Sequence, residues 1–408
     1  MQRMSNDALI IGAGPSGLCM ARALAKAGIA VTVLEQSDAD ALAAPADDGR
    51  EIALTHASRA SLEALGLWRH FKETEIAPLE RALVLDGDDR EGLTFDPPER
   101  TRAPLGWLVP NHAIRRAAHA EAAASEGVTI VGGARVNGLE PGPDSIRVSL
   151  EDGRGFEARL AIAADNRFST CRRAMGIPAD HHDFGKVMIV VQVRHEKPHA
   201  ATAWEWFRYG QTLALLPLHD PNIASAVLTV PTTDASAFLA LSTDAQGADL
   251  TRRFDGRLGT MQVATRAFAY PLVGVYARRF VAERFALVGD AAVGMHPVTA
   301  HGFNFGLASV VRLAQLIEDA RRSGRDIAQP HLLARYERGH RRATRPLYAA
   351  TRLVADLYTD DRLPVRVMRK GALRIATHLP GFRERIANRL IDRDVRPRFP
   401  FARWIALR

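Results

Sequence analysis

The sequence has few cysteines and no long apolar segment, and each absence excludes a class of protein. Its two cysteines, Cys19 and Cys171, cannot form a disulfide framework, and no cysteine and histidine spacing typical of a zinc site occurs. No window of about 18 apolar residues is present, so we expect no membrane-spanning helix. Polar residues 1–7 lead directly into an apolar run and leave no room for a secretory signal peptide. We therefore expect a cytoplasmic protein without a metal site.

Net positive charge is absent from most of the chain and concentrated near its end. Residues 362–408 contain 13 lysines and arginines against three acidic residues, in a chain whose net charge is +8. Such a segment can contact an anionic membrane surface or an acidic protein in a biosynthetic complex, or it can be an ordinary solvated helix face. We expect no nucleic-acid ligand. The 408 residues exceed the length of a single hydrophobic core, so two or three structural units are expected.

Periodicity in the first third of the chain predicts an α/β protein. Residues 8–11 are an apolar run typical of a buried strand, residues 15–27 are helical, and residues 30–34 form a second strand. Gly28 occupies the position favoured just after a helix. The crossover of this strand–helix–strand unit should be right-handed. Residues 128–131 are predicted to extend the same sheet.

The middle of the chain is richer in strands. Long strands with little helix between them are predicted for residues 187–193, 203–218 and 223–230, which suggests a second, sheet-based unit inserted into the first. A buried strand at residues 285–288 and a helix from Gly302 to about Arg322 follow. Beyond Ile327 the pattern is helical to the end of the chain.

The turn after the first strand fits the pattern G-x-G-x-x-G. Its residues are Gly12, Ala13, Gly14, Pro15, Ser16 and Gly17. In this pattern the first glycine makes a tight turn, the second lets the backbone approach a pyrophosphate, and the third lets helix and strand pack closely. Glu35 ends the second strand, where a carboxylate accepts hydrogen bonds from ribose hydroxyls. Strand, turn, helix and acid together predict a dinucleotide site.

A second cluster begins with Gly289-Asp290-Ala291-Ala292 and continues through His296 to a helix that starts at Gly302. An acid at the carboxyl end of a strand can hold a polyol chain, and a helix N-terminus can stabilise negative charge on a bound ring. From the pattern alone, a structural loop and a binding site are equally good interpretations.

These residues resemble a known family. The Gly289-Asp290-Ala291-Ala292 run, with His296-Pro297 and Gly302-x-Asn304, is similar to the second flavin motif of the group A flavoprotein monooxygenases. Within that group the chain resembles the ubiquinone-biosynthesis FAD-dependent hydroxylases of the UbiH, UbiF and UbiI kind. The run from Val293 to Asn304 looks most like the UbiM branch, the demethoxyubiquinol hydroxylases. The likeness extends to residues 49–54, where the family places an arginine near the flavin, and to residues 213–218.

The resemblance implies an α/β fold with a Rossmann-type FAD-binding domain of the glutathione-reductase-like, para-hydroxybenzoate-hydroxylase type. This domain is predicted to comprise residues 1–75, 100–180 and 275–330. Residues 76–99 and 181–274 would form an inserted mixed β-sheet substrate domain, and residues 331–408 a basic, helical C-terminal segment.

The resemblance also implies the chemistry: ring hydroxylation of a polyprenylated phenol or quinol by O2 through a flavin C4a-hydroperoxide. FAD is the expected cofactor and NAD(P)H the expected electron donor. The predicted FAD-binding residues are Gly12, Ala13, Gly14, Pro15, Ser16, Gly17, Glu35, Arg50, Asn111, Asp290, Gly302 and Asn304. No catalytic residue is assigned, and the loop candidates are His296, Pro297 and His301. A lipid substrate fits a peripheral position at the inner membrane.

The chain departs from the family pattern at several positions. Val293 stands where a histidine is common, His301 where glutamine is usual, and Ile114 where a leucine is usual. The middle fingerprint, normally Gly-Ala-Asp-Gly, is Ala163-Ala164-Asp165-Asn166 here, and this segment serves both FAD and NADPH in the family. Two alternatives stay open: a group A hydroxylase of a soluble aromatic acid, and a non-catalytic flavin- or lipid-binding subunit of a biosynthetic complex.

Three further features are interpreted as structural. Alternating Trp204 and Trp206 are expected to pack on one face of a strand. The adjacent side chains of His181-His182-Asp183 diverge on a regular backbone, so no metal site is expected there. Cys171 is expected to be a small buried residue.

Overall fold

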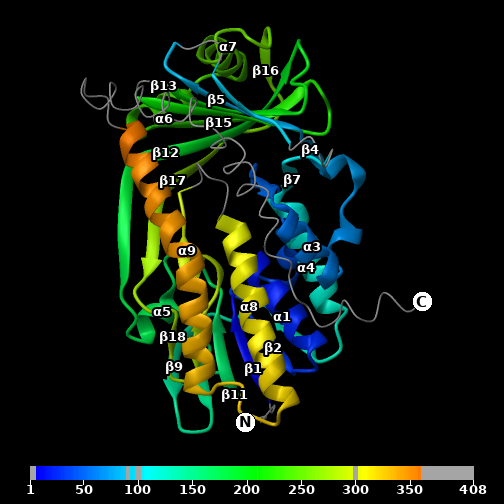
Figure 1. Ribbon diagram of the computed structural model, residues 1–408, viewed down its shortest axis with the longest axis vertical. Helices are drawn as coiled ribbons and strands as arrows, with labels where there is room; N and C mark the ends of the chain where they lie inside the picture. Colours follow the sequence, from blue (N-terminus) through cyan, green and yellow to red (C-terminus); the bar gives the residue numbers. More distant parts are fainter. Residues whose placement is uncertain (1–5, 89–91, 98–102, 209, 297–301, 360–408) are drawn as a thin grey trace.

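The computed structural model describes residues 6–88, 92–97, 103–208, 210–296 and 302–359, and Figure 1 shows their arrangement. A first sheet with helices α1, α8 and α9 occupies the lower half of that view, and a second sheet with α6 and α7 lies above it. A small third sheet lies between the two. The α/β fold and the sheet-rich middle of the chain agree with the sequence prediction.

The first sheet is built around the opening strand–helix–strand unit. Its described strands are β1 (Asn6–Ile11), β2 (Val31–Leu34), β8 (Val128–Val131), β9 (Val136–Pro141), β10 (Ile146–Leu150), β11 (Gly155–Ala163), β18 (Val281–Ala282) and β19 (Phe285–Leu287). Strands β19, β11, β1, β2 and β8 run parallel in that order. The apolar runs of β19, β11, β1 and β2 are buried because helices cover the sheet, whereas β8 at the edge is only partly buried. Strands β10 and β11 form an antiparallel hairpin whose turn contains Gly153.

Helices surround this sheet. They are α1 (Pro15–Lys26), α2 (Ala39–Ala43), α3 (His56–Leu65), α4 (Asn111–Ala123), α5 (Thr170–Ala174), α8 (Gly302–Arg322), α9 (Pro330–Thr359) and the short 3-10 helices η1 (Trp68–His70), η2 (Glu73–Glu75) and η3 (Gly289–Ala291). Helix α1 contacts both α4 and α8, and α9 packs on α8. Residues 360–408, which include most of the predicted basic tail, lie outside the described part of the chain. No described helix is both long and apolar enough to cross a bilayer.

The second sheet joins two distant segments of the chain. Its described strands are β5 (Arg81–Asp86), β6 (Leu93–Phe95), β12 (Ala179–His195), β13 (Thr202–Arg208), β14 (Gln211–Pro217), β15 (Ile223–Pro231), β16 (Met261–Val263), β17 (Phe268–Ala277) and β20 (Val293–Gly294). Strand β5 pairs with β13, so residues 81–86 and 202–208 meet in one sheet. The division into three domains stays a prediction.

Two predictions for the second sheet need correction. The strand expected at residues 203–218 is two antiparallel strands, β13 and β14, because the chain reverses between Arg208 and Gln211. Helices α6 (Thr232–Leu239) and α7 (Thr243–Arg253) were not predicted. Their apolar side chains, among them Phe238 and Leu250, pack on one face of the sheet together with Trp204 and Trp206. The two tryptophans are therefore packing residues, as expected.

The third sheet connects the other two. It consists of β3 (Glu51–Leu54), β7 (Gly106–Pro110) and β4 (Ala77–Leu79), all antiparallel. The predicted flavin-contacting arginine, Arg50, directly precedes β3, and β7 leads directly into α4, which begins at Asn111.

Candidate functional site

The glycine turn after β1 shows what each of its three glycines does. Gly12 has a φ of +104°, and a Cβ there would lie 2.6 Å from the carbonyl oxygen of Ala164. A Cβ on Gly17 would lie 1.9 Å from the oxygen of Gly12, so only glycine lets α1 approach the turn. A Cβ on Gly14 meets nothing within 4 Å. Backbone atoms fill the side-chain space at the first and last glycines of the turn. The space at the middle glycine is empty, so a ligand can approach the backbone there.

Glu35 lies beside this turn at the end of β2. Its Oε2 accepts a hydrogen bond of 2.7 Å from the Ala13 amide, and its Oε1 accepts one of 3.0 Å from the Ser37 amide. Helix α1 begins at Pro15 with no side-chain cap at Gly14. The uncapped N–H groups and the positive end of the helix dipole favour a bound anion, as in dinucleotide sites.

The two motifs, separated by about 270 residues, meet in space. A Cβ on Gly289 or on Gly306 would each lie 2.8 Å from the hydroxyl oxygen of Ser16 in α1. The Gly289 amide donates to the Ser309 hydroxyl at 3.1 Å, and that hydroxyl donates to the Gly306 carbonyl at 2.5 Å. The second motif and the start of α8 are thus packed on the start of α1.

Asp290 lies in η3, just after β19. Its Oδ2 accepts a hydrogen bond of 3.1 Å from Arg167, whose other terminal nitrogen donates to the carbonyl of Val273 in β17 at 3.0 Å. Arg167 belongs to the segment that departs from the middle fingerprint of the family. This arginine was not predicted from the sequence, because its partner lies 123 residues away.

Arg50 and Asn111, both predicted near the flavin, are brought together by Asp48. The carboxylate Oδ2 of Asp48 accepts hydrogen bonds from Arg50 Nη2 at 2.6 Å and from Asn111 Nδ2 at 2.7 Å. Burial opposes ionisation of Asp48, but the charge and hydrogen bond of Arg50 and the Asn111 amide outweigh it and lower its pKa. The Tyr270 hydroxyl donates to the Asp48 carbonyl at 2.6 Å. Asp48 was also not predicted as a site residue, because nothing in the sequence around it indicates such a role.

Asn304 joins the start of α8 to the third sheet. Its Oδ1 accepts from the Thr55 amide at 3.2 Å and its Nδ2 donates to the Ala53 carbonyl at 2.8 Å. A Cβ on Gly302 would meet nothing within 4 Å, so the first residue of α8 is open like Gly14. Asn304 fixes the position of this helix N-terminus relative to β3.

The loop candidates are only partly described. His296 is buried and packs edge-on against Phe184, with ring centroids 4.5 Å apart. Pro297 and His301 lie outside the described residues. Cys171 is buried, and burial raises the pKa of its thiol, so it is a packing residue as expected. Within the described residues, no group of histidine, cysteine and acidic side chains is arranged to hold a metal.

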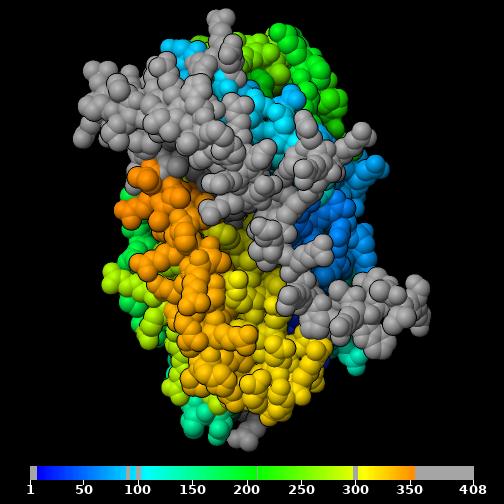
Figure 2. All heavy atoms as spheres, in the orientation of Figure 1, coloured from blue at the N-terminus to red at the C-terminus, as the bar shows by residue number. Residues whose placement is uncertain are grey.

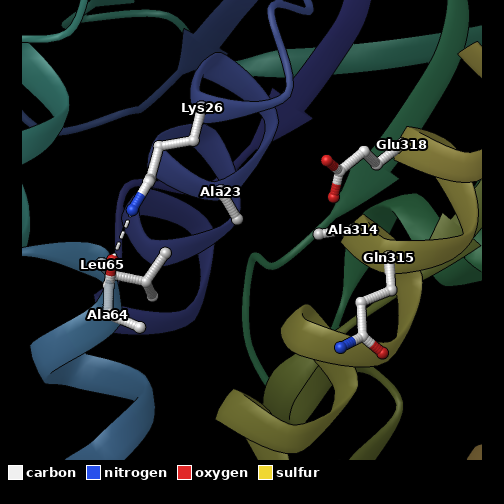
Figure 3. A pocket seen from close by; sticks show the side chains of 7 residues that line it. All are labelled: Ala23, Lys26, Ala64, Leu65, Ala314, Gln315 and Glu318. Atoms are coloured by element: carbon white, nitrogen blue, oxygen red, sulfur yellow. Dashed lines mark hydrogen bonds between the residues drawn. The ribbon is translucent and has the colours of Figure 1, made fainter. Parts of the chain in front are cut away.

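A separate hollow lies between α1, α3 and α8 (Figure 3). It is lined by Ala23, Lys26, Ala64, Leu65, Ala314, Gln315 and Glu318. The Lys26 ammonium closes one side by donating to the Ala64 carbonyl at 2.5 Å. Since it contains neither motif, it is not part of the candidate site.

Comparison with known proteins decides the family. A family model described as an FAD binding domain matches residues 5–350. The chain is also 41% identical over 391 residues to the ubiquinone hydroxylase UbiM of Neisseria meningitidis, covering 95% of this chain and 85% of that protein. The chain belongs to the FAD-dependent ubiquinone hydroxylase family. It is therefore a flavoprotein monooxygenase, as the resemblance predicted, and FAD is its cofactor.

More distant members of this family and its fold are also similar. The 3-demethoxyubiquinol 3-hydroxylase of Escherichia coli is 27% identical over 377 residues, covering 92% of this chain and 96% of that protein. The crystal structure of p-nitrophenol 4-monooxygenase PnpA from Pseudomonas putida aligns with a TM-score of 0.77 at 18% identity, over 97% of this chain and all of that one. An HpxO variant from Klebsiella pneumoniae, complexed with FAD, aligns with a TM-score of 0.70 at 24% identity, over 95% and 98% of the two chains. Both structures support the predicted fold.

The geometry fits the FAD of this family. An open glycine cradle at Gly14, an uncapped helix N-terminus and a carboxylate at the end of β2 are what a dinucleotide requires. The assignment of individual FAD-binding residues stays a prediction.

Proposed function

We propose that this flavoprotein hydroxylates the aromatic ring of a polyprenylated phenol or quinol in ubiquinone biosynthesis. O2 is the oxidant and NAD(P)H the electron donor. The observation that carries the proposal is the 41% identity, over nearly the whole chain, to a protein named ubiquinone hydroxylase. The arrangement of the site supports it in three respects, which concern the cofactor, the substrate and the membrane.

On the cofactor side, bound FAD supplies the activation of O2 that ring hydroxylation requires. The residues of this chain bind and orient it. The N–H groups at the start of α1 would hold the pyrophosphate, and Glu35 would accept a hydrogen bond from a ribose hydroxyl. Asp290, which accepts a hydrogen bond from Arg167, would bind the polyol chain. The N-terminus of α8, fixed by Asn304, would stabilise negative charge on the flavin ring.

On the substrate side, the second sheet presents one face to the third sheet. We call it the inner face, defined by Gln192 and Tyr270. Gln192 Nε2 donates to Glu51 Oε1 at 3.4 Å, and Tyr270 donates to the carbonyl of Asp48. Apolar residues of the inner face, such as Val190 and Val227, are suited to a prenylated ring and exclude water from it.

A membrane surface is the source of such a substrate, and α9 has a face suited to it. The solvent-exposed arginines of α9 are Arg335, Arg338, Arg342, Arg345 and Arg352. Spacings of three and four residues place the first four on one side of the helix. Figure 2 shows α9, in orange, along the surface of the molecule. We propose peripheral attachment to an anionic leaflet through this arginine face and the basic residues beyond it.

A hydroxylase of a soluble aromatic acid is the second candidate. Such a site needs a cation to hold the substrate carboxylate. In register across the inner face, Val190 and Val227 align with an acid, Glu205, and with no cation among the described residues. An acid in place of a cation disfavours an anionic substrate.

The proposal is tested by complementation and by oxygen consumption. In a bacterial strain that lacks its quinone ring hydroxylases, expression of the chain should restore one missing hydroxylation, detected by mass spectrometry of the extracted quinones. Purified FAD-loaded protein should consume O2 with NAD(P)H and a short-tail prenylphenol. Accumulation of unmodified precursor, despite soluble FAD-loaded protein, would contradict the proposal. Stimulation by a soluble aromatic acid alone would favour the second candidate.

A further inference from the structure

Strands β13, β14 and β15 have two very different faces. Side chains alternate along a strand, so Trp204 and Trp206 point to one face and Glu205 to the other. The face with the tryptophans is closed by α6 and α7, whose Phe238 and Leu250 belong to the same apolar cluster. Glu205 therefore lies on the inner face, which contacts Glu51 and Asp48 of the flavin-binding side.

Glu205 belongs to a straight row of residues across the inner face. In register, the row is Val84, Glu205, Ala214, Val227, Val190 and Phe268, on strands β5, β13, β14, β15, β12 and β17. Every other member is apolar. At about 4.8 Å per strand, the row extends about 19 Å from Glu205 to Phe268.

Both ends of the row touch the flavin-binding side of the molecule. A Cβ on Gly49, next to Arg50, would lie 2.5 Å from the ring of Phe268. At the other end, Val84 packs on the apolar cluster of Leu93, Phe95 and Leu105. Leu105 directly precedes β7, which pairs with β3. The row thus spans the region where a ring-shaped substrate would lie between the sheet and the flavin.

The Glu205 side chain is half-buried, its neighbours in the row are apolar, and its carboxyl group has no hydrogen bond or ion pair with any described residue. Burial raises the pKa of Glu205 to about 8. A polar group that lacks a protein partner in an apolar binding site is commonly satisfied by the ligand. At neutral pH the protonated acid offers one donor and one acceptor, which matches a neutral hydroxyl and not an anion.

We propose that Glu205 is the specificity-determining residue that hydrogen-bonds a ring hydroxyl of the phenol or quinol substrate. This inference rests on the proposed function and names the group that recognises its substrate. A hydroxyl completes the hydrogen bonding of the carboxyl, whereas an analogue without it covers the acid and leaves it unsatisfied. Sites of this kind discriminate strongly against analogues that lack the hydrogen-bonding group.

The test compares two ligands and three variants of the FAD-loaded full chain. The ligands are a short-tail prenylphenol and its O-methyl ether, which differ only in the hydroxyl proton and a methyl group. The variants are Glu205→Leu, Glu205→Gln and, as a matched control, Glu140→Leu on exposed β9 of the first sheet. Affinity is measured from the change in flavin absorbance on titration, which does not depend on turnover.

Wild-type protein should bind the phenol about 10-fold more tightly than the ether, which is the effect of one hydrogen bond of about 1.4 kcal/mol. Glu205→Leu should lose this discrimination because only its affinity for the phenol falls. Glu205→Gln should retain part of it, since an amide also accepts and donates, and Glu140→Leu should match wild type. The role of Glu205 would be overturned if Glu205→Leu lost affinity for both ligands equally. It would also be overturned if phenol affinity were unchanged in both Glu205→Leu and Glu205→Gln. Either result would leave the proposed function intact. If wild-type protein bound neither ligand but bound a soluble aromatic acid, the proposed function itself would be wrong, and this inference with it.

Discussion

Gly14 and Gly17 share a motif but differ in what surrounds them. Gly17 is glycine because the oxygen of Gly12 occupies the space of a side chain. Gly14 has room for a methyl group and a φ of −70°, which any residue adopts, so the protein itself does not require glycine there. The requirement at Gly14 therefore comes from the ligand, and that at Gly17 from the fold.

The first prediction separates these two requirements. Gly17→Ala should destabilise the apoprotein by about 2 kcal/mol or more, because α1 must move away from the turn. Gly14→Ala should change apoprotein stability by less than about 0.5 kcal/mol but weaken FAD binding at least 10-fold. Thermal unfolding without FAD and flavin titration give the two quantities. Normal FAD affinity in Gly14→Ala would show that the pyrophosphate does not bind next to Gly14.

The sequence predicted the bounds of helices and strands more accurately than the side-chain contacts between distant residues. Helix α8 begins and ends where predicted, because its apolar spacing is regular, and so does β8. Helices α6 and α7 were missed because few apolar residues mark them, among them Phe238 and Leu250. Both flavin motifs were found because each is contiguous. Asp48 and Arg167 were not, because their significance lies in partners 63 and 123 residues away.

The exposed arginines of α9 give the second prediction, at the scale of an element. Replacing Arg338, Arg342 and Arg345 by glutamate should reduce binding to anionic vesicles, since each arginine near an anionic leaflet contributes about 1 kcal/mol. Flotation of the full chain with phosphatidylglycerol vesicles, at low and high salt, measures this binding. The matched control replaces Arg135, Arg147 and Arg154 of the first sheet's hairpin region by glutamate. Equal flotation of both triple variants would exclude α9 as the membrane-binding face.

At the scale of the whole molecule, polar contacts join the second sheet to its neighbours. Arg167 links Asp290 in η3 to the carbonyl of Val273 in the second sheet, and Gln192 of the second sheet donates to Glu51 of the third sheet. Glu51 Oε2 is buried without a hydrogen-bond partner among the described residues. Burial, with a contribution from the charge of Asp47, raises the pKa of Glu51 from 4.5 to about 8. The joint between the sheets thus contains a carboxyl group that stays protonated at neutral pH.

The third prediction is the pH dependence that follows. Between about pH 4.5 and pH 8 the unfolded chain loses the Glu51 proton while the folded chain keeps it. The unfolded state therefore binds fewer protons, and the free energy of unfolding falls as pH rises through this range. Glu51→Gln should remove part of that fall, so the variant should gain about 1 kcal/mol or more relative to wild type between pH 5 and pH 8.5. Urea unfolding at both pH values measures it, and identical slopes for the two proteins would contradict the assignment.

The contact of Ser16 with Gly289 and Gly306 has a consequence for synthesis in the cell. The ribosome adds about 290 residues after the glycine turn before it reaches Gly306. At about 5–20 residues per second, the glycine turn waits on the order of 15 to 60 s for the helix that packs on it. The nascent chain therefore has no complete cradle until that helix has been made. We expect FAD to bind only after that point, so its capture would report that translation has passed Gly306.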